Sequence, residues 1–130
     1  AMRFLVVAFL LAGVGLAGAP RRQRQLAIQV VEAVAHRTHD GVITLDGRVR
    51  NTGRRQIEGL VIVFDFMASG GSVITTQKFE AEEAVLESGK DAIYRAQIND
   101  HVRAVKYRVS AVDKSGRHLH VTRPGPYVID

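Results

Sequence analysis

The side chains best suited to metal chemistry lie in one short segment, residues 36–40 (HRTHD). Imidazole and carboxylate ligands three or four residues apart converge when such a segment is helical, as a zinc site requires. On a strand that runs into a turn the same side chains diverge, and no third ligand clusters with them. His36, His39 and Asp40 are therefore weak metal candidates, and we expect neither a metal nor another cofactor.

The remaining reactive residue types have the spacing of structural elements. His118 and His120 alternate on an expected strand and would supply only two ligands. The acidic stretch 80–87 (EAEEAVLE) lacks the alternating Asp, Asn and Gly of a calcium loop. The chain has no cysteine, and no serine has the setting of a strained, glycine-flanked nucleophile. The sequence predicts a protein that is not an enzyme.

The positive charge is concentrated near the amino terminus. The formal net charge is +5, and four of the 18 basic residues precede residue 25. The other fourteen face all 13 acidic residues, so the body of the chain is almost neutral. A nucleic-acid-binding surface is cationic and interleaved with aromatic residues. The nearest approach is a set that we interpret as a solvated edge, and we expect no nucleic-acid partner: Arg48, Arg50, Arg54 and Arg55.

Residues 4–19 (FLVVAFLLAGVGLAGA) are uncharged and apolar. As a helix they span roughly 24 Å, slightly less than a hydrocarbon core of ~30 Å. This segment is either a retained membrane anchor or a cleaved signal peptide. The small residues 17–19 suit signal cleavage, but Pro20 makes a cut after Ala19 unfavourable. The start Ala-Met-Arg fits a chain that lost only an initiator methionine, and we expect an uncleaved signal-anchor.

Small residues cluster in this segment at spacings of four, which allows another helix to approach closely. The predicted helix-packing residues are Ala8, Ala12, Gly13, Gly15 and Ala17. The basic residues that follow are predicted to contact lipid headgroups: Arg21, Arg22 and Arg24. Taken alone, the three arginines after the segment slightly favour a cytoplasmic domain.

From Leu26 onward the apolar residues recur with a period of two, and turn residues recur every 8 to 12 positions. This pattern predicts a seven-stranded antiparallel β-sandwich over residues 25–123. An anchor helix with its basic collar (1–24) precedes it, and an extended tail (124–130) follows. Residues 26–37 fit a helix or a strand. The acidic stretch is expected to cross between two sheets, and Gly47 is expected to mark a bulge or a close backbone approach.

Residues 57–68 (IEGLVIVFDFMA) are the most apolar expected strand. One face, which includes Phe64 and Phe66, is predicted to face the core. The other face carries Val61, Val63 and Met67, which would mark a partner surface if they were exposed. In the tail, Tyr127 and Ile129 either add to the sheet edge of a partner or pack on their own sandwich. We include all five residues in the expected partner surface.

Residues 64–68 (FDFMA), the turn 47–53 (GRVRNTG), Ser88-Gly89, Tyr94 and the strand 107–109 (YRV) together carry a family resemblance. The segment 45–112 resembles the FxLYD domain family, whose members are small immunoglobulin-like sandwiches of bacterial envelope proteins. Phe64 fits the family's naming motif, whereas Phe66, Met67 and Ala68 stand where the family has Leu, Tyr and Asp. The resemblance implies a non-enzymatic, extracytoplasmic module, often tethered by an N-terminal helix.

These observations predict an accessory or structural subunit of a bacterial membrane or envelope assembly. We expect a single pass through the inner membrane, with the sandwich outside the cytoplasm. The expected partners are protein subunits of a membrane complex and, through residues 4–19, the lipid bilayer. The alternative is a secreted or periplasmic ligand-binding β-sandwich whose signal peptide has been cleaved.

Overall fold

Ten β-strands make up the part of the chain that the computed structural model describes, residues 26–99 and 103–130. None of these residues lies in a helix. The strands are β1 (Ala27–Arg37), β2 (Val42–Asn51), β3 (Ile57–Glu58), β4 (Val61–Met67), β5 (Val73–Glu80), β6 (Val85–Leu86), β7 (Asp91–Asn99), β8 (Lys106–Val112), β9 (His120–Thr122) and β10 (Tyr127–Val128).

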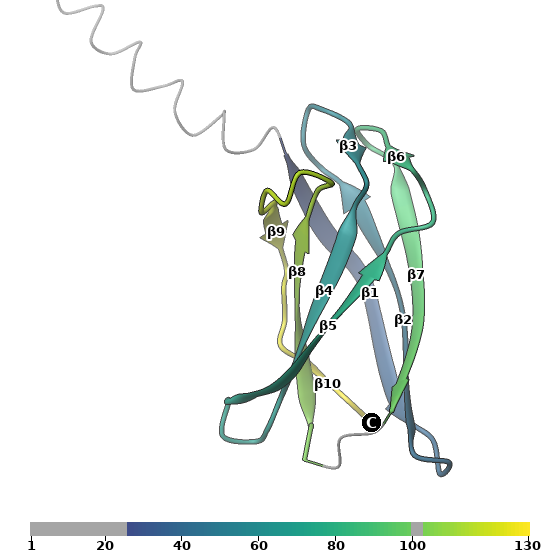
Figure 1. Cartoon of the computed structure of the whole chain (residues 1–130), viewed down its shortest axis with the longest axis vertical. Coiled ribbons are helices and arrows are strands. Elements are labelled where there is room, and N and C mark those ends of the chain that lie inside the picture. Colours follow the sequence, from purple (N-terminus) through teal and green to yellow (C-terminus); the bar gives the residue numbers. More distant parts are fainter. Residues whose placement is uncertain (1–25, 100–102) are drawn as a thin grey trace, which may run out of the picture.

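The strands form two four-stranded sheets and one small sheet. The first sheet has the order β7-β2-β1-β9, the second has the order β10-β8-β4-β5, and β3 pairs with β6. The two larger sheets lie face to face, as Figure 1 shows. The strand β1 begins at the end of the sandwich that carries β3 and β6, and the carboxyl terminus lies at the opposite end (Figure 1). The predicted all-β, two-layer architecture is therefore confirmed.

The number and direction of the strands differ from the prediction of seven antiparallel strands. The described residues contain ten strands, and β9 runs parallel to β1, with Ala27 opposite His120. The last expected strand ends as β9, and the expected tail 124–130 contributes a further strand, β10, which pairs with β8 of the second sheet. Pro124 and Pro126 separate these two strands and have no N–H to donate, so a single ladder cannot continue through them. The chain changes sheet at this point.

Residues 26–37, which fit either a helix or a strand, form the strand β1. Its register shifts between Val30 and Glu32. Such a bulge reverses the parity of the inward positions, and the buried residues accordingly change from Ile28 and Val30 to Ala35. This reversal explains why the segment lacks a clean period of two.

The core lies between the two large sheets, and aromatic rings dominate it. Phe64 and Phe66 of β4 are fully buried, as the sequence predicts. The ring centroid of Phe64 lies 5.2 Å from that of Tyr94 in the first sheet and 5.8 Å from that of Tyr107 in the second. Tilted and edge-on ring contacts at these distances are favourable. The strand β4 therefore joins both layers.

Gly47 marks a close approach and not a bulge. The register of β2 runs without a break through Gly47, which lies opposite Ala33 of β1 and Tyr94 of β7. A Cβ atom at this position would lie 2.1 Å from the Cζ and hydroxyl oxygen of Tyr94. The sequence therefore requires glycine here because the Tyr94 ring lies directly against the backbone of β2.

The turn after β2 depends on the side chain of Asn51 and not on positive φ angles at Asn51 and Gly53, which the structure does not have. Asn51 is fully buried. Its Nδ2 donates to the backbone oxygens of Arg55 and Leu86, and its Oδ1 accepts from the N–H of Gly53, each at 2.9 Å. One amide thus holds the turn 52–56 against β6.

Candidate functional site

The structure does not bring the histidine candidates together as a metal site. The side chain of His36 is exposed near the end of β1, and His39 and Asp40 lie in the following turn. The Nε2 of His39 is 3.9 Å from Oδ1 of Asp40, and both side chains are largely exposed. No group of three possible ligands occurs among residues 26–99 and 103–130. The strand-to-turn path separates the side chains, as its geometry dictates.

The acidic stretch forms the crossover from β5 in the second sheet to β7 in the first, as expected. Within it, β6 pairs with β3 through Leu86 opposite Ile57. Glu80, Glu82 and Glu87 are exposed. His118 and His120 are also exposed and lie on either side of the buried Leu119. The glutamates belong to the crossover and the histidines to the short strand β9 and the residues before it. Their side chains do not converge on a common point where a ligand could bind.

Several predicted sites lie outside the described residues. They are the helix-packing set Ala8, Ala12, Gly13, Gly15 and Ala17, and the headgroup set Arg21, Arg22 and Arg24. Within the described ranges, the structure has no helix with the length and hydropathy that a bilayer crossing requires.

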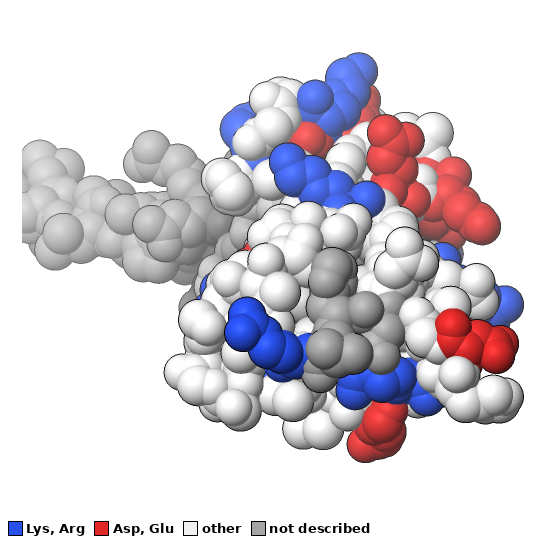
Figure 2. Space-filling model, turned by 60° about the horizontal axis from the view of Figure 1, so that its bottom comes forward, with Lys and Arg blue, Asp and Glu red and all other residues white. Residues whose placement is uncertain are grey.

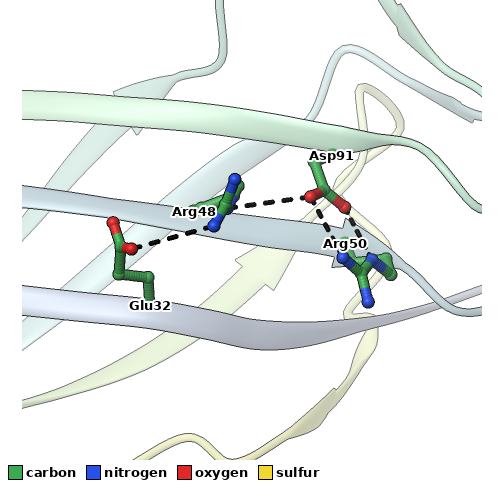
Figure 3. Close-up of polar contacts among 4 residues, drawn as sticks. All are labelled: Glu32, Arg48, Arg50 and Asp91. Carbon is green, nitrogen blue, oxygen red and sulfur yellow. Dashed lines mark hydrogen bonds and ion pairs between the residues drawn. The ribbon is translucent and has the colours of Figure 1, made fainter.

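The outer face of the first sheet carries a ladder of paired charges, which we call the arginine ladder: Glu32, Arg48, Arg50 and Asp91 (Figure 3). Arg50 donates to Asp91 through Nε at 2.7 Å and Nη2 at 3.2 Å. Arg48 lies 3.7 Å from each of two carboxylates, through Nε to Oδ2 of Asp91 and through Nη2 to Oε2 of Glu32. Arg48 and Arg50 are thus not on a solvated edge, because β2 is an inner strand with an acidic residue on each neighbour.

The arginine ladder neutralises its own charges. The hydrogen bond from Arg50 lowers the pKa of Asp91 below its ordinary value, and the same bond raises the pKa of Arg50. Beside the ladder, Arg95 donates to Asp46 at 2.8 Å. Charges of both signs are also interspersed at the end of the molecule drawn in Figure 2, without an extended patch of one sign.

The outer face of the second sheet carries apolar side chains on either side of Asp65, which lies midway along β4. The cross-strand register places Val128, Lys106, Met67 and Val73 in one row across all four strands. Val61 and Val63 lie on β4 beyond Asp65. We define the apolar face by its five hydrophobic members: Val61, Val63, Met67, Val73 and Val128. No described segment covers it, and Val73 and Val128 are 47% and 69% exposed.

The predicted partner surface is corrected in part. Val63 and Met67 are only 9% and 8% exposed, because β4 is an inner strand with neighbours on both sides. Tyr127 and Ile129 do not extend toward a partner. The Tyr127 ring packs 5.6 Å from that of Tyr107, and Ile129 belongs to the core. The tail therefore packs on its own sandwich, and Val128 between them points outward.

Sequence reasoning missed four residues of this face: Val73, Val128, Lys78 and Lys106. They come from three strands, and only the register places them beside β4. The alternation within residues 106–112 and 73–80 gives their parity, but nothing in it identifies the partner strand. Their immediate neighbours give no signal, because Val73 precedes Ile74 and Val128 lies between Tyr127 and Ile129.

A groove of about 520 Å³ opens between β5 and β7, which diverge toward the end of β7 in Figure 1. Phe79 and Ile98 are partly buried there and pack against the core. The described residues that line it are uncharged: Val42, Gln77, Phe79, Gln97, Ile98 and Asn99. This lining can hold an apolar or amide-bearing group, and it offers no acid or base.

Two buried tyrosines bring polar hydroxyls into the core. The hydroxyls of Tyr94 and Tyr107 have no hydrogen-bond partner among the described residues. Burial raises the pKa of Tyr107 to about 12, and it raises the pKa of Tyr94 as well. Both hydroxyls therefore stay protonated at ordinary pH and do not serve as a base.

No protein-family model matches the chain, and no curated protein matches it. The resemblance to the FxLYD family therefore stays a prediction. Among solved structures, the chain is similar to IrmA from Escherichia coli, with 14% identity and a TM-score of 0.45 over 82% of this chain and 98% of that chain.

A second similar structure is the Pseudomonas fluorescens alkylpurine DNA glycosylase AlkC, bound to DNA containing an abasic site analogue. The identity is 15% and the TM-score 0.43, over 82% of this chain and 30% of that chain. Because that protein was solved on DNA, the expectation that excluded nucleic acid as a partner is corrected and is not retained. Both likenesses have TM-scores below 0.5, and neither assigns an activity or a ligand to this chain.

Proposed function

We propose that this protein is a membrane-anchored, non-enzymatic accessory subunit that binds protein partners in a bacterial membrane or envelope assembly. The observation that carries the proposal is the apolar face. Val73 and Val128 expose about half or more of their surface on a sheet that no described segment covers. Burying a valine side chain in an interface is favourable by ~1.5 kcal/mol or more. Such a face is typical of a protein-binding surface.

The finer fold that we propose is immunoglobulin-like. Three features support it. The acidic crossover links β5 of the second sheet to β7 of the first, the last strand is shared between the sheets as β9 and β10, and β4 lies at the centre of the aromatic core. A sandwich of this kind commonly serves as a scaffold for contact surfaces, and its function resides in the surface and not in the fold.

The anchor and the location rest on the sequence. Residues 4–19 form the proposed membrane helix, with the small-residue side for lateral packing and Arg21, Arg22 and Arg24 at the headgroups. The proposed location of the sandwich, outside the cytoplasm on the inner membrane, follows the FxLYD resemblance. The non-enzymatic character rests on the missing cysteine and the missing nucleophile motif.

Copurification of the full-length protein from native membranes tests the partner. We expect companion proteins with the unaltered chain and at least about tenfold less with V73K/V128K, because a charge buried within an apolar contact is costly. I93K is the matched control, since Ile93 is 61% exposed on the outer face of the first sheet. Equal recovery with V73K/V128K and the unaltered chain would refute the proposed surface.

Detergent dependence tests the anchor. We expect the native protein to require detergent for extraction and to retain residues 1–17. A freely soluble monomer that lacks these residues would contradict the anchor, whichever surface binds the partner.

The groove between β5 and β7 favours a second candidate function, a secreted or periplasmic ligand-binding sandwich. Its volume of about 520 Å³ lies within the range of small-molecule sites. This candidate requires a mature chain that begins near Gly18 or Pro20. N-terminal sequencing of native protein decides between the two candidates, because the accessory subunit retains the leader.

A further inference from the structure

The apolar face carries two cations that no described residue neutralises. Lys106 lies beside Met67, and Lys78 lies opposite Val63 on β5. Neither lysine forms an ion pair with any residue in 26–99 or 103–130. Both side chains therefore present ammonium groups next to apolar surface, where a partner's burial of that surface would strengthen an added ion pair.

The acidic residue nearest to these lysines is already engaged. Asp65 lies between Val63 and Met67 on β4. It accepts a hydrogen bond from Thr76 Oγ1 at 2.7 Å and lies 3.4 Å from Nη2 of Arg108. The other acid on the outer face is Glu80, at the far end of β5 opposite Val61. Around Met67 and Val63 the face is thus apolar with a positive excess.

We propose that the apolar face binds an acidic protein segment, whose apolar side chains cover Val73 and Val128 and whose carboxylates pair with Lys78 and Lys106. The assignment rests on the proposed function, because it names the chemistry of the partner at that same surface. Charge complementarity selects the partner and sets its register, while the apolar contacts supply most of the affinity.

Other anionic partners fit this surface less well. A nucleic acid presents a regular row of phosphates and is bound by many cations, whereas this face offers two free lysines separated by valines. With residues 4–19 as the anchor, the bilayer would lie near the end of the sandwich where β1 begins. The row of Val128, Lys106, Met67 and Val73 lies toward the opposite end (Figure 1).

The test uses the full-length protein in detergent micelles and four probes. They are an eight-residue peptide of alternating Glu and Val, the same peptide with Gln in place of Glu, a short DNA duplex, and phosphatidylglycerol added to the micelles. Binding is followed by NMR of valine methyl groups. We expect the acidic peptide to perturb Val63, Val73 and Val128 and to bind at least about fivefold more tightly than its Gln counterpart.

The variants make the charge requirement specific. K78Q/K106Q should abolish the preference for the acidic peptide, and K90Q should retain it, because Lys90 is exposed in the turn before β7 and away from this face. Equal affinity for the two peptides, no binding of either, or a preference that survives K78Q/K106Q would overturn the acidic assignment. DNA or phosphatidylglycerol binding that needs the lysines but leaves the valine methyls unperturbed would also overturn it.

The two proposals can fail separately. If companion proteins are lost with V73K/V128K but kept with K78Q/K106Q in high and low salt, the surface is correct and the acidic partner is wrong. If companions are kept with V73K/V128K, the proposed surface itself is wrong.

Discussion

The outer faces of the two large sheets share one pattern of alternating side chains but differ in how they match charge. On the first sheet, Arg50 and Arg48 meet Asp91 at 2.7 and 3.7 Å, and Arg95 meets Asp46 at 2.8 Å. On the second sheet, Asp65 of β4 meets Arg108 of β8 at 3.4 Å, but Lys78 and Lys106, which lie beside Val63 and Met67, are paired with no described residue. The charges of the arginine ladder are paired within the first face, whereas the two lysines of the second face have no partner among the described residues.

This difference indicates which face is suited to contact. Exposed cross-strand ion pairs contribute little to stability, but they leave no unmatched charge for a partner to satisfy. A partner of the first sheet would have to separate these pairs in order to bury them, which is costly. On the second face this barrier applies to the pair of Asp65 and Arg108, whereas Val73 and Val128 are exposed and Lys78 and Lys106 are paired with no described residue.

The substitution with the largest expected effect is G47A, which disturbs the pairing of β2 with β7 that positions the arginine ladder. The added Cβ would lie 2.1 Å from the Tyr94 ring, so β2 and β7 must move apart and the arginine ladder must come out of register. We expect a loss of at least about 3 kcal/mol in the free energy of unfolding, measured by urea denaturation.

G70A is the matched control for G47A, because nothing lies within 4 Å of a Cβ at Gly70. It should leave stability nearly unchanged. Adding Y94L to G47A removes the obstructing ring atoms and should make the cost of the alanine much smaller. A G47A protein as stable as the unaltered one would show that Tyr94 does not hold the two strands in this register.

A smaller difference in stability is expected between V63A on the second face and I93A on the first. Both substitutions remove a β-branched side chain from a strand, so the loss of strand propensity is common to both. Val63 is 9% exposed and Ile93 is 61% exposed. We expect V63A to cost about 1.5 kcal/mol and I93A about 0.5 kcal/mol, measured by thermal unfolding of the protein without a partner. Equal costs would contradict the burial of the apolar face's centre.

The layers and most turns of this fold could be predicted from the sequence, because local alternation and turn chemistry specify them. The inward set of β4 and the hairpin at Ser115-Gly116 follow from period and composition. The pairing of the predicted tail with β8, as the strand β10, could not be predicted with the same means. Proline shows where a ladder stops, but not which sheet the chain joins next.

The contact surface was only half predictable for the same physical reason. Parity along β4 identifies Val61, Val63 and Met67 as one face. Val73 and Val128 join them through the register of strands far apart in the sequence, which is a tertiary property. Likewise, Arg48 and Arg50 look like free cations until β1 and β7 bring Glu32 and Asp91 beside them.

The smallest expected effect is a pH dependence of the stability that the arginine ladder contributes to the first sheet. Because Arg50 lowers the pKa of Asp91 in the folded protein, the paired carboxylate stabilises the fold fully above its ordinary pKa of about 4. This contribution is lost as the pH falls through the lower, folded value. D91N should reduce Tm by no more than about 3 °C near neutral pH, and the two proteins should converge once the pH lies below the lowered pKa of Asp91. D40N, at an exposed turn position, is the control and should leave Tm nearly unchanged near neutral pH. A D91N difference that persists undiminished in acid would mean that the ladder stabilises the sheet through packing and not through charge.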